Sequence, residues 1–465
     1  MINNEWRDSP SGETLQIVSP WDGQEVGCVP AATAEQAVGA VHNSKDTFGS
    51  WRRSSIKQRV DIFRGALEKM RQNTDLLIGL LSKEIGKTEE SAKHEIDRSL
   101  AYIELVVEAI KQMRGNVYYG DITGAYPRGR KTGYYSREPL GVVLAISPFN
   151  YPINLSVTKI APAVISGNTV VLKPSTQGSL TAIELYKYFV EAGLPPGVLN
   201  IITGKSSEIG DPLLTNKDVS LIAFTGSTGV GNHIRQVANG IPLLLELGGK
   251  DTAIVTSKAD LEVTAEQLTS GGFSYCGQRC TAQKMVLVYE EIADELVKRV
   301  VEGSKHLNLN PLIDDESADF VSSLIDDAVE KGAVKALGGK RNKNHIEANV
   351  LDHVTDEMRL FHEEQFGPVL PIVRVTGEEE ALAKHNSIRY GLQGSVYTNN
   401  IEEAFRIADK LEVGTVQING RPDRGPDNFP FGGVKDSGQF MQGTIETIEL
   451  MTRGKLTVVN LHKYD

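Results

Sequence analysis

Short β-branched segments alternate with helical stretches from Gly141 onward, and this alternation limits the chain to a small set of folds. Four segments have the length and composition of buried strands: GVVLAIS (141–147), NTVVLKP (168–174), VLNIITG (198–204) and VSLIAFTGS (219–227). Helical patterns follow them at residues 153–164, 179–192, 208–214 and 229–238. Because strands joined by crossover helices run parallel, the pattern predicts a doubly wound parallel sheet of the α/β class.

A second series of strand-like segments follows residue 250. Its members are DTAIV (251–255), KMVLVY (284–289), PVLPIVRV (368–375), GSVYT (394–398) and GTVQIN (414–419). Helical stretches separate them, so the series predicts a second α/β domain. The first third of the chain instead carries long amphipathic patterns at residues 34–48, 56–70 and 74–113. A chain of 465 residues also exceeds what one hydrophobic core usually organises.

The tail GKLTVVNLHKYD (454–465) alternates like an edge strand. It follows every segment with which it would obviously pair. Two interpretations stay open at this point: it is the last strand of its own domain, or it pairs with a partner subunit.

Charge and hydropathy exclude several classes of partner. The chain has 60 acidic and 49 basic side chains, a net charge of -11, which opposes binding to nucleic acid and to anionic membranes. No apolar run approaches transmembrane length, and the start MINNEWRDSPSGE has no signal-peptide core. With only three cysteines, which suits a reducing compartment, we expect a cytoplasmic protein that binds neither nucleic acid nor membranes.

Two of the three cysteines lie four residues apart in GFSYCGQRCTAQK (272–284). A disulfide or a metal site needs partner residues. The third cysteine, Cys28, lies far upstream, and no second cysteine pair or histidine pair is spaced to complete a metal cluster. We therefore expect no metal. Two alternatives remain open from the residues alone: two small buried core residues, or one nucleophilic thiol with its supporting groups.

Residues directly after the predicted strands are candidate ligand contacts, because parallel sheets bind ligands beyond the C-terminal ends of their strands. The turn GSTGVG after residue 225 is a weak signal alone, since glycines often open helices, although its backbone N–H groups suit a pyrophosphate. Lys173 at another strand end is either a surface lysine or a ligand contact.

A carboxylate, Glu246, lies inside the apolar run LLLELGGKDTAIV (243–255). A buried charge is costly without a partner or a task, so Glu246 belongs either to a structural ion pair or to a catalytic site. Burial would raise its pKa towards neutrality, where a general base works best. No histidine has a local signature for activating the thiol, so a papain-like hydrolase is not supported.

Several motifs together resemble those of the aldehyde dehydrogenase superfamily, in order and over essentially the whole chain. They are SPFNYP, VLKPST, FTGSTGVG, ELGGK, GQRC, EEQFGP and NFPFGGVKDSG. Within the superfamily, SPFNYP, CGQRCTA and DRGPDNFPF most resemble the NADP-dependent, non-phosphorylating glyceraldehyde-3-phosphate dehydrogenases. The chain is similar, less closely, to lactaldehyde and succinic semialdehyde dehydrogenases.

The resemblance implies a domain organisation. A Rossmann-type cofactor domain is expected at residues 1–114 and 134–246, and a catalytic α/β domain at residues 247–431. A small β oligomerisation element is expected at residues 115–133 and 445–465. The implied assembly is a homotetramer, a dimer of dimers.

The resemblance also implies catalytic roles. Cys280 matches the nucleophile that forms a thiohemiacetal, and Asn150, with the N–H of Cys280, matches the group that receives the oxyanion. Glu246 matches the base that activates water to hydrolyse the thioester. Cys276 is then expected to be a packing residue. A nearby cation should lower the pKa of the thiol, and the adjacent Arg279 is the candidate.

The implied cofactor is NADP. Its expected contacts are Ser147, Lys173, Thr176, Lys205, Asp211, Gly226, Ser227, Gly231 and Glu364. NAD-preferring relatives often have a glutamate where this chain has Thr176. Because a carboxylate would repel the 2′-phosphate and a hydroxyl can donate to it, Thr176 favours NADP.

The implied substrate is a small phosphorylated aldehyde, D-glyceraldehyde 3-phosphate, oxidised irreversibly to 3-phosphoglycerate without inorganic phosphate. Its expected contacts are Arg98, Asn150, Tyr151, Arg279, Thr281 and Arg424. Guanidinium groups give paired hydrogen bonds to phosphate oxygens, but they hold carboxylates too, so succinic semialdehyde is an alternative, as is lactaldehyde. Glu246 disfavours a CoA-acylating enzyme, and a non-catalytic protein on the same fold is the remaining alternative.

Overall fold

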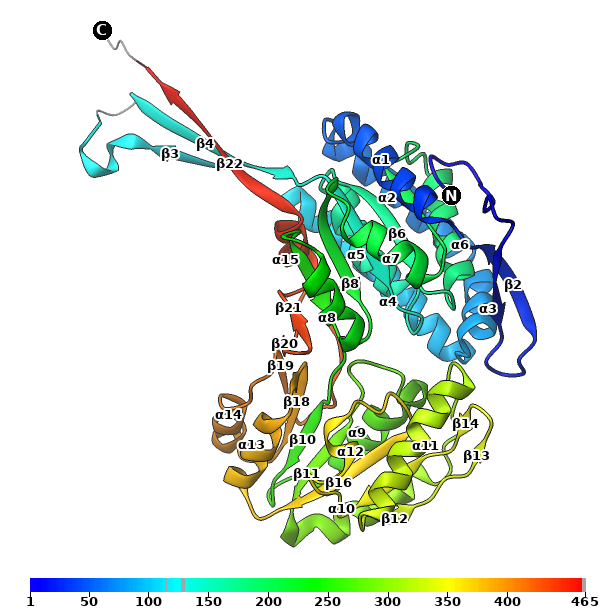
Figure 1. The fold of residues 1–465 in the computed structure, drawn as a ribbon. Helices are drawn as coiled ribbons and strands as arrows, with labels where there is room; N and C mark the ends of the chain where they lie inside the picture. Colours follow the sequence, from blue (N-terminus) through cyan, green and yellow to red (C-terminus); the bar gives the residue numbers. More distant parts are fainter. Residues whose placement is uncertain (114, 127–129, 462–465) are drawn as a thin grey trace.

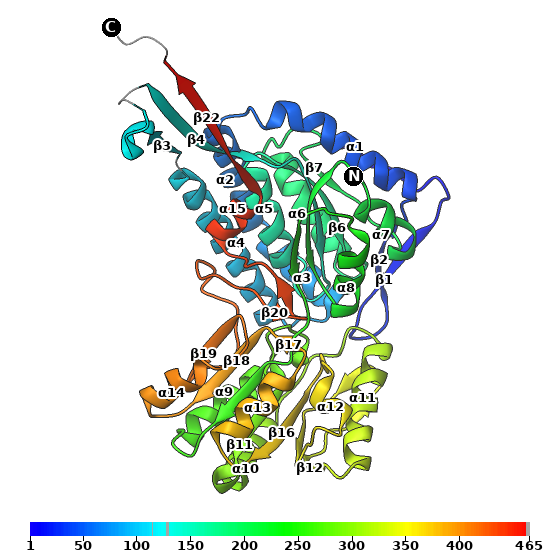
Figure 2. The same ribbon diagram turned by 60° about the vertical axis from the view of Figure 1, so that its left-hand side comes forward.

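The computed structural model describes residues 1–113, 115–126 and 130–461. Two α/β lobes and a projecting three-stranded arm make up the molecule (Figure 1). The turned view separates the same two lobes, with the arm extending from the lobe that contains the N-terminus (Figure 2). Among the described residues, no helix combines the length and the apolar character needed to cross a membrane.

The first lobe begins with a helical layer. A short hairpin, β1 (Thr14–Val18) and β2 (Glu25–Pro30), precedes α1 (Ala34–Trp51), α2 (Ile56–Gln72), α3 (Thr74–Ile85) and α4 (Glu89–Gln112). The helical pattern predicted over residues 74–113 forms two helices because Gly86 ends α3 in the left-handed region, at a φ of 69°. Thr88 then starts α4 by accepting a hydrogen bond from the N–H of Ser91.

The predicted doubly wound sheet is confirmed in this lobe. Its strand order is β21-β9-β8-β5-β6-β7. The parallel strands are β5 (Val142–Ser147), β6 (Thr169–Pro174), β7 (Leu199–Ile201), β8 (Val219–Thr225) and β9 (Leu243–Glu246). The helices between and after them are α5 (Asn154–Ile165), α6 (Ser179–Glu191), α7 (Ser206–Leu214) and α8 (Thr228–Val237).

Alternate residues of the central strand β5 point into two separate cores. Val143 and Ala145 belong to the core beneath α2, α4, α5 and α6, whereas Val142 and Leu144 belong to the core beneath α1, α7 and α8. Both faces of the sheet are therefore covered, which is why its strands read as nearly continuous apolar runs in the sequence.

The second lobe contains the predicted second sheet, with strand order β12-β15-β16-β11-β10-β18-β19. The strands are β10 (Thr252–Val255), β11 (Met285–Tyr289), β12 (Val334–Leu337), β15 (Asn349–Asp352), β16 (Val369–Val375), β18 (Gln393–Tyr397) and β19 (Thr415–Ile418). The helices are α9 (Leu261–Phe273), α10 (Glu290–Ser304), α11 (Asp315–Glu330), α12 (Arg359–His362), α13 (Glu378–Ser387) and α14 (Ile401–Ala408). Only the edge strand β12 runs antiparallel to its neighbour within this described sheet.

The arm consists of β3 (Asn116–Tyr119), β4 (Lys131–Pro139) and β22 (Thr452–Asn460), in the order β22-β4-β3. Strand β22 pairs with β4 over its whole length, from Thr452 opposite Pro139 to Asn460 opposite Lys131. The described part of the tail is therefore paired within its own chain, and within the described residues no strand pairs with the other edge of β22. The predicted ranges that contain the arm and its flanks include residues 114, 127–129 and 462–465, which lie outside the described residues.

The remaining elements are short and connect these parts. They are η1 (Gly120–Thr123), η2 (Ser274–Gly277), β13 (Arg341–Asn342), β14 (His345–Ile346), β17 (Tyr390–Gly391), β20 (Val434–Lys435), β21 (Gly438–Gln439) and α15 (Thr444–Leu450). Strand β21 crosses to the first lobe and pairs antiparallel with β9, with Gly438 opposite Glu246. A segment from the end of the chain thereby borders the strand that carries Glu246.

Candidate active site

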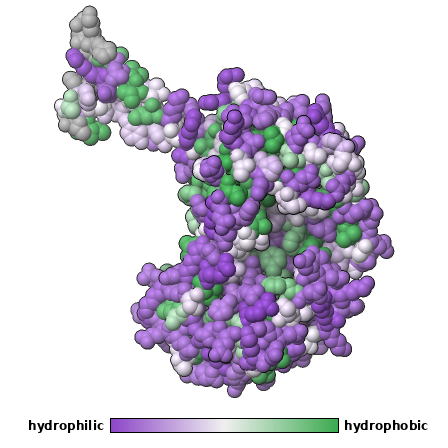
Figure 3. All heavy atoms as spheres, in the orientation of Figure 1, coloured by the Kyte–Doolittle hydropathy of each residue, from purple (hydrophilic) through white to green (hydrophobic). Residues whose placement is uncertain are grey.

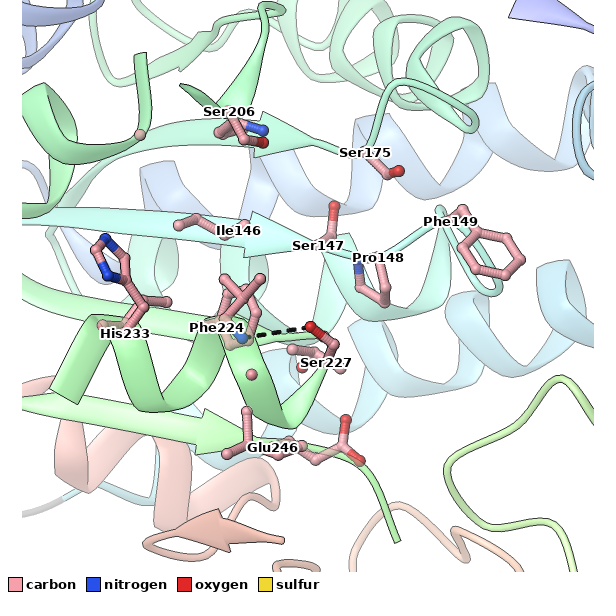
Figure 4. Close-up of a pocket in the computed structure, with 18 of the residues that line it drawn as sticks. Ile146, Ser147, Pro148, Phe149, Ser175, Ser206, Phe224, Ser227, His233 and Glu246 are labelled. Atoms are coloured by element: carbon pink, nitrogen blue, oxygen red, sulfur yellow. Dashed lines mark hydrogen bonds between the residues drawn. The ribbon is translucent and has the colours of Figure 1, made fainter. Parts of the chain in front are cut away.

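A cavity of about 770 Å³ lies at the C-terminal ends of β5, β6, β8 and β9. Figure 4 shows Ser147 and Ser175 at neighbouring strand ends, Ser227 directly before α8, His233 on α8 and Glu246 at the end of β9. The same cavity reaches Cys280, which comes from the second lobe. The cavity thus lies where parallel sheets usually bind ligands, beyond the C-terminal ends of their strands, and residues of both lobes line it.

Glu246 is buried, as its place in an apolar run predicts. Its side chain is 1% exposed, and neither carboxyl oxygen makes a hydrogen bond of ordinary geometry within the described part of the chain. Burial raises the pKa of Glu246, while the neighbouring thiol of Cys280 and the charges of Arg424 and Lys159 act to lower it. A raised pKa suits a general base that must take a proton near neutral pH.

The turn that carries Cys280 has an unusual backbone. Tyr275 and Cys276 have positive φ angles of 49° and 55°, and Gly277 follows at 71°. A Cβ at Gly277 would overlap the carbonyl oxygen of Gly367, so only glycine fits there. Cys276 is completely buried in the core of the second lobe, which agrees with its expected packing role.

The expected lowering of the thiol pKa is not found. Burial, followed by the neighbouring carboxyl group of Glu246, raises the pKa of Cys280 well above its ordinary value. The adjacent Arg279 is directed elsewhere, because its Nη2 donates to the carbonyl oxygen of Gly271 at 2.8 Å. The cation that acts to lower the pKa of this thiol is Lys284.

The amide of Asn150 is held beside the nucleophile turn. Its Nδ2 donates to the carbonyl oxygen of Gln278 at 2.9 Å, which leaves the second amide hydrogen available. Gln278 is fixed in turn, because its side chain donates to the carbonyl of Pro311 and accepts from the N–H of Ile313. The Asn150 amide is thus oriented before any substrate binds.

Lys159 is a site residue that the sequence analysis missed. It lies in the fully buried helix α5, and its Nζ donates to the hydroxyl of Thr225 at 2.7 Å and to the carbonyl of Leu155 at 3.0 Å. Burial lowers the pKa of Lys159 to about 7. The available signal was a lysine in an otherwise apolar run, the same kind of signal that identified Glu246.

Six of the residues predicted to bind the cofactor line the cavity: Ser147, Lys173, Asp211, Gly226, Ser227 and Glu364. Lys173 is almost completely buried, and burial lowers its pKa. Cavity-lining residues that the sequence analysis missed are Ser175, Ser206, Ser207, Gly229, His233 and Phe366.

Three predicted cofactor contacts lie outside the cavity wall. Thr176 follows the lining residue Ser175, and Lys205 is an exposed lysine that forms an ion pair with Glu13. Gly231 faces the side chain of Leu247, where a Cβ would overlap it, so this glycine permits helix packing.

Glu364 is held at the mouth of the cavity by two groups of the second lobe. Its Oε1 accepts a hydrogen bond from the N–H of Gly249 at 3.0 Å and lies 3.1 Å from the Nζ of Lys284. The carboxylate is therefore fixed in place and is largely buried.

The predicted substrate arginines form a cluster in which two of them, Arg98 and Arg424, share the carboxylate of Asp427. Arg98 forms a two-point ion pair with Asp427, with both N···O distances at 2.9 Å. Arg424 lies 3.6 Å from the same carboxylate. Within the described residues, the Nη1 of Arg424 and the Nε of Arg279 are buried without a hydrogen-bond partner.

Tyr151 connects this arginine cluster to a buried lysine. The Nζ of Lys87 lies 3.6 Å from the centre of the Tyr151 ring and pairs with Glu95. Burial raises the pKa of Tyr151 to about 12, and the charges of Arg279 and Arg98 oppose that rise. Thr281, the remaining predicted contact, is buried directly after Cys280.

The described residues contain no group of three or more His, Cys, Asp or Glu side chains arranged to hold a metal ion. What they bring together is a thiol, a general base and a cavity of dinucleotide size, which suits covalent oxidation of an aldehyde. The chain belongs to the aldehyde dehydrogenase family, whose model matches residues 6–457. The family resemblance seen in the motifs is thereby confirmed.

Individual relatives agree with this assignment over nearly the full length. The chain is 45% identical to the NADP-dependent glyceraldehyde-3-phosphate dehydrogenase of Streptococcus equinus, with 99% of this chain and 98% of the relative covered. It is 34% identical to the lactaldehyde dehydrogenase of Methanocaldococcus jannaschii, with 96% and 98% covered. Among solved structures, the NADP complex of the NADP-dependent glyceraldehyde-3-phosphate dehydrogenase of Bacillus halodurans superposes with a TM-score of 0.97 at 43% identity, covering 99% and 98% of the two chains.

Proposed function

We propose that this chain oxidises D-glyceraldehyde 3-phosphate to 3-phosphoglycerate, with NADP as the hydride acceptor and hydrolysis as the final step. The observation that carries the proposal is the pair of buried, unpartnered guanidinium nitrogens on Arg279 and Arg424. Buried N–H groups are nearly always hydrogen-bonded in proteins, so these two are placed to meet an acceptor that arrives with the substrate. The Streptococcus equinus and Bacillus halodurans relatives support this choice of substrate.

The charge of the arginine cluster matches a phosphate dianion. The pairs of Lys87 with Glu95 and of Arg98 with Asp427 are internally neutral. Two positive charges remain, those of Arg279 and Arg424. Planar guanidinium groups bind phosphate oxygens through paired hydrogen bonds, which places the aldehyde end of a three-carbon substrate towards Cys280.

In the first half of the reaction, the sulfur of Cys280 attacks the aldehyde carbon and forms a thiohemiacetal. The amide of Asn150 and the backbone N–H of Cys280 stabilise the oxyanion that develops. Collapse of the thiohemiacetal expels a hydride and leaves a thioester on Cys280; NADP, when bound in the cavity, would supply the hydride acceptor.

In the second half, Glu246 takes a proton from a water molecule, and the resulting hydroxide attacks the thioester carbonyl. The C–S bond breaks, 3-phosphoglycerate leaves and the sulfur of Cys280 is regenerated. Since neither oxygen of Glu246 has a hydrogen-bond partner among the described residues, both are available to the water.

Removing one arginine tests the substrate assignment. Arg279→Leu should lower kcat/KM for glyceraldehyde 3-phosphate by about 30- to 100-fold, the loss of a charged hydrogen bond, and should change oxidation of unphosphorylated glyceraldehyde far less. Steady-state kinetics on both aldehydes, and on succinic semialdehyde and lactaldehyde, measure the difference.

Arg421→Leu is the matched control for Arg279→Leu. Arg421 is a partly exposed arginine near the cluster whose guanidinium group lies 3.9 Å from Asp423. Its loss should affect all the aldehydes equally and weakly. If Arg279→Leu loses equal activity on phosphorylated and unphosphorylated aldehydes, the cluster does not bind phosphate. If the wild type prefers succinic semialdehyde or lactaldehyde, that aldehyde is the substrate instead of glyceraldehyde 3-phosphate.

The cavity residues fit NADP. The N-terminal turn of α8 presents backbone N–H groups beside Gly226 and Ser227, a setting that suits a pyrophosphate. Glu364 would hold ribose hydroxyls at the end near Cys280, and Lys173 with Ser175 would hold the adenosine end. Thr176 follows the lining residue Ser175 directly, so its side chain would lie near the 2′-phosphate of a bound NADP.

Thr176→Glu should shift the cofactor preference from NADP towards NAD, because a carboxylate beside the 2′-phosphate repels it. The expected change is at least about tenfold in the ratio of the two kcat/KM values, equivalent to about 1.4 kcal/mol. Lys205→Met is the control: Lys205 pairs with Glu13 outside the cavity, so its loss should leave the ratio unchanged. If Lys205→Met changes the ratio of the two kcat/KM values and Thr176→Glu does not, then Lys205, and not Thr176, determines the cofactor preference.

The projecting arm is the proposed oligomerisation element of a homotetramer, a dimer of dimers. Its exposed apolar residues include Val117, Leu456 and Val458. In Figure 3 the surface of the arm shows hydrophobic residues (green) next to hydrophilic ones (purple). Exposed apolar surface on an open sheet favours association. In this proposal the first lobe is the cofactor domain, the second lobe is the catalytic domain and the arm is the oligomerisation element. A reducing, cytoplasmic location, which we also propose, would keep Cys280 a thiol.

A further inference from the structure

Lys284 is a buried lysine that the reaction steps above do not use. Its side chain is 1% exposed. Its Nζ donates to the carbonyl oxygen of Cys280 and also lies 3.1 Å from the Oε1 of Glu364. A single ammonium group therefore contacts the backbone of the nucleophile and the carboxylate proposed to hold the cofactor ribose.

The backbone of Lys284 is fixed from both sides. Its N–H donates to the carbonyl oxygen of Asp251 at 2.9 Å, and its carbonyl accepts from the side chain of Gln365 at 3.0 Å. Gln365 directly follows Glu364 in the chain. The lysine is thus anchored to the segment before β10 and to the loop that carries Glu364.

A second buried lysine in the same region shows that burial alone does not explain these contacts. Lys250 is equally buried, but its Nζ donates to the carbonyl of Glu363 at 2.7 Å and to the side chain of Gln365 at 2.6 Å. These bonds hold one loop, whereas those of Lys284 join two functional groups. Burying a charged lysine is costly, so we expect Lys284 to have a function next to Cys280.

Two carboxyl groups and two lysines lie around the thiol of Cys280, and burial raises the pKa of both carboxyl groups, that of Asp251 to about 8. Glu246 is the last residue of β9 and Asp251 directly precedes β10, and both raise the pKa of the thiol. Lys159 also faces it from α5, but burial lowers the pKa of that lysine to about 7, so its charge is partial near neutral pH. Lys284 acts in the opposite direction to the two carboxyl groups.

We propose that Lys284 is a positioning residue that ties the nucleophile turn to Glu364 and places its ammonium group next to Cys280. It therefore has two effects. It favours the thiolate over the thiol, and it holds Glu364 ready for the cofactor ribose. The inference rests on the proposed function in taking Cys280 as the nucleophile and Glu364 as a cofactor contact.

The test measures alkylation of Cys280 by iodoacetamide as a function of pH in the NADP-free protein, with peptide mass analysis. A Cys28→Ser background removes the exposed thiol. Lys284→Met should move the alkylation profile to higher pH and slow alkylation at neutral pH by about tenfold, the effect of one pKa unit. NADP binding, followed by fluorescence, should weaken several-fold in the same variant. Lys284→Arg should restore the wild-type alkylation profile.

Lys250→Met is the matched control, since it removes an equally buried lysine that does not contact Cys280. A structural role alone would make Lys250→Met and Lys284→Met alike in their alkylation profiles, and that result overturns the proposal. If Lys284→Met does not fold, Lys284→Gln decides, because it keeps a donor for the Cys280 carbonyl without the charge: a profile shifted to higher pH supports the proposal and an unshifted one overturns it. Alkylation needs no substrate, so this result is independent of the proposed substrate.

Discussion

Cys280→Ser is expected to abolish aldehyde oxidation, with kcat reduced by a factor on the order of 10⁴ to 10⁶, as when other covalent enzymes lose their nucleophile. A serine hydroxyl is a much weaker nucleophile, and no histidine of the described site is placed to activate it. NADP reduction followed by absorbance in the presence of glyceraldehyde 3-phosphate measures the loss. NADP binding should be retained, because the residues that line the adenosine end of the cavity are unchanged.

Cys276→Ser is the matched control for Cys280→Ser. Cys276 has the same chemistry and lies four residues away, but it is completely buried, and burial raises the pKa of its thiol. A serine there places a hydroxyl in an apolar core, which should reduce stability by about 1 to 3 kcal/mol while most of the activity remains at moderate temperature. Equal loss of activity in the two variants would show that Cys280 is not the nucleophile.

The parts of the fold that the sequence predicted are those determined by local periodicity. The buried strands β5, β6 and β8 read as apolar runs because both faces of their sheet are covered. Strand β21 (Gly438–Gln439) could not be predicted, since two residues become a strand only by meeting β9 almost two hundred positions earlier in the chain. The residues alone left the partner of the tail open for the same reason: β4 precedes β22 by more than three hundred positions.

The site residues, too, could be predicted where the signal is local in the sequence and not where it depends on a distant residue. Glu246 could be identified because a charge within an apolar run is visible in the sequence, and Lys159 carries an equivalent signal that was overlooked. Asp427 could not be found in this way, because its importance lies in a two-point ion pair with Arg98, a residue 329 positions away.

Adjacency in sequence also misled one assignment. Arg279 directly precedes Cys280, yet its guanidinium group donates to the carbonyl of Gly271. Lys284, four residues after Cys280, donates to the carbonyl of Cys280 instead. The direction of a side chain depends on the backbone of the turn, and here Tyr275 and Cys276 adopt left-handed conformations that sequence reasoning does not expect for such residues.

Glu246→Gln is expected to separate the two halves of the reaction. The amide has nearly the same shape, and neither oxygen of Glu246 makes a hydrogen bond within the described residues, so the substitution should not disturb the fold. Attack by Cys280 should proceed at least as fast, because Glu246 raises the pKa of the thiol and its removal favours the thiolate. Thioester hydrolysis should slow by about 10²- to 10⁴-fold, the usual contribution of a general base.

Stopped-flow absorbance should therefore show, for Glu246→Gln, a burst of reduced cofactor close to one equivalent per active site, followed by a slow steady state. The pH dependence gives a second check. In the wild type, hydrolysis should fall as the pH drops through the raised pKa of Glu246, because the protonated carboxyl group cannot accept a proton from water. Glu246→Gln should lose that acidic limb. A variant without a burst would instead assign Glu246 to the attack by Cys280, since a group needed only for hydrolysis leaves the first turnover intact.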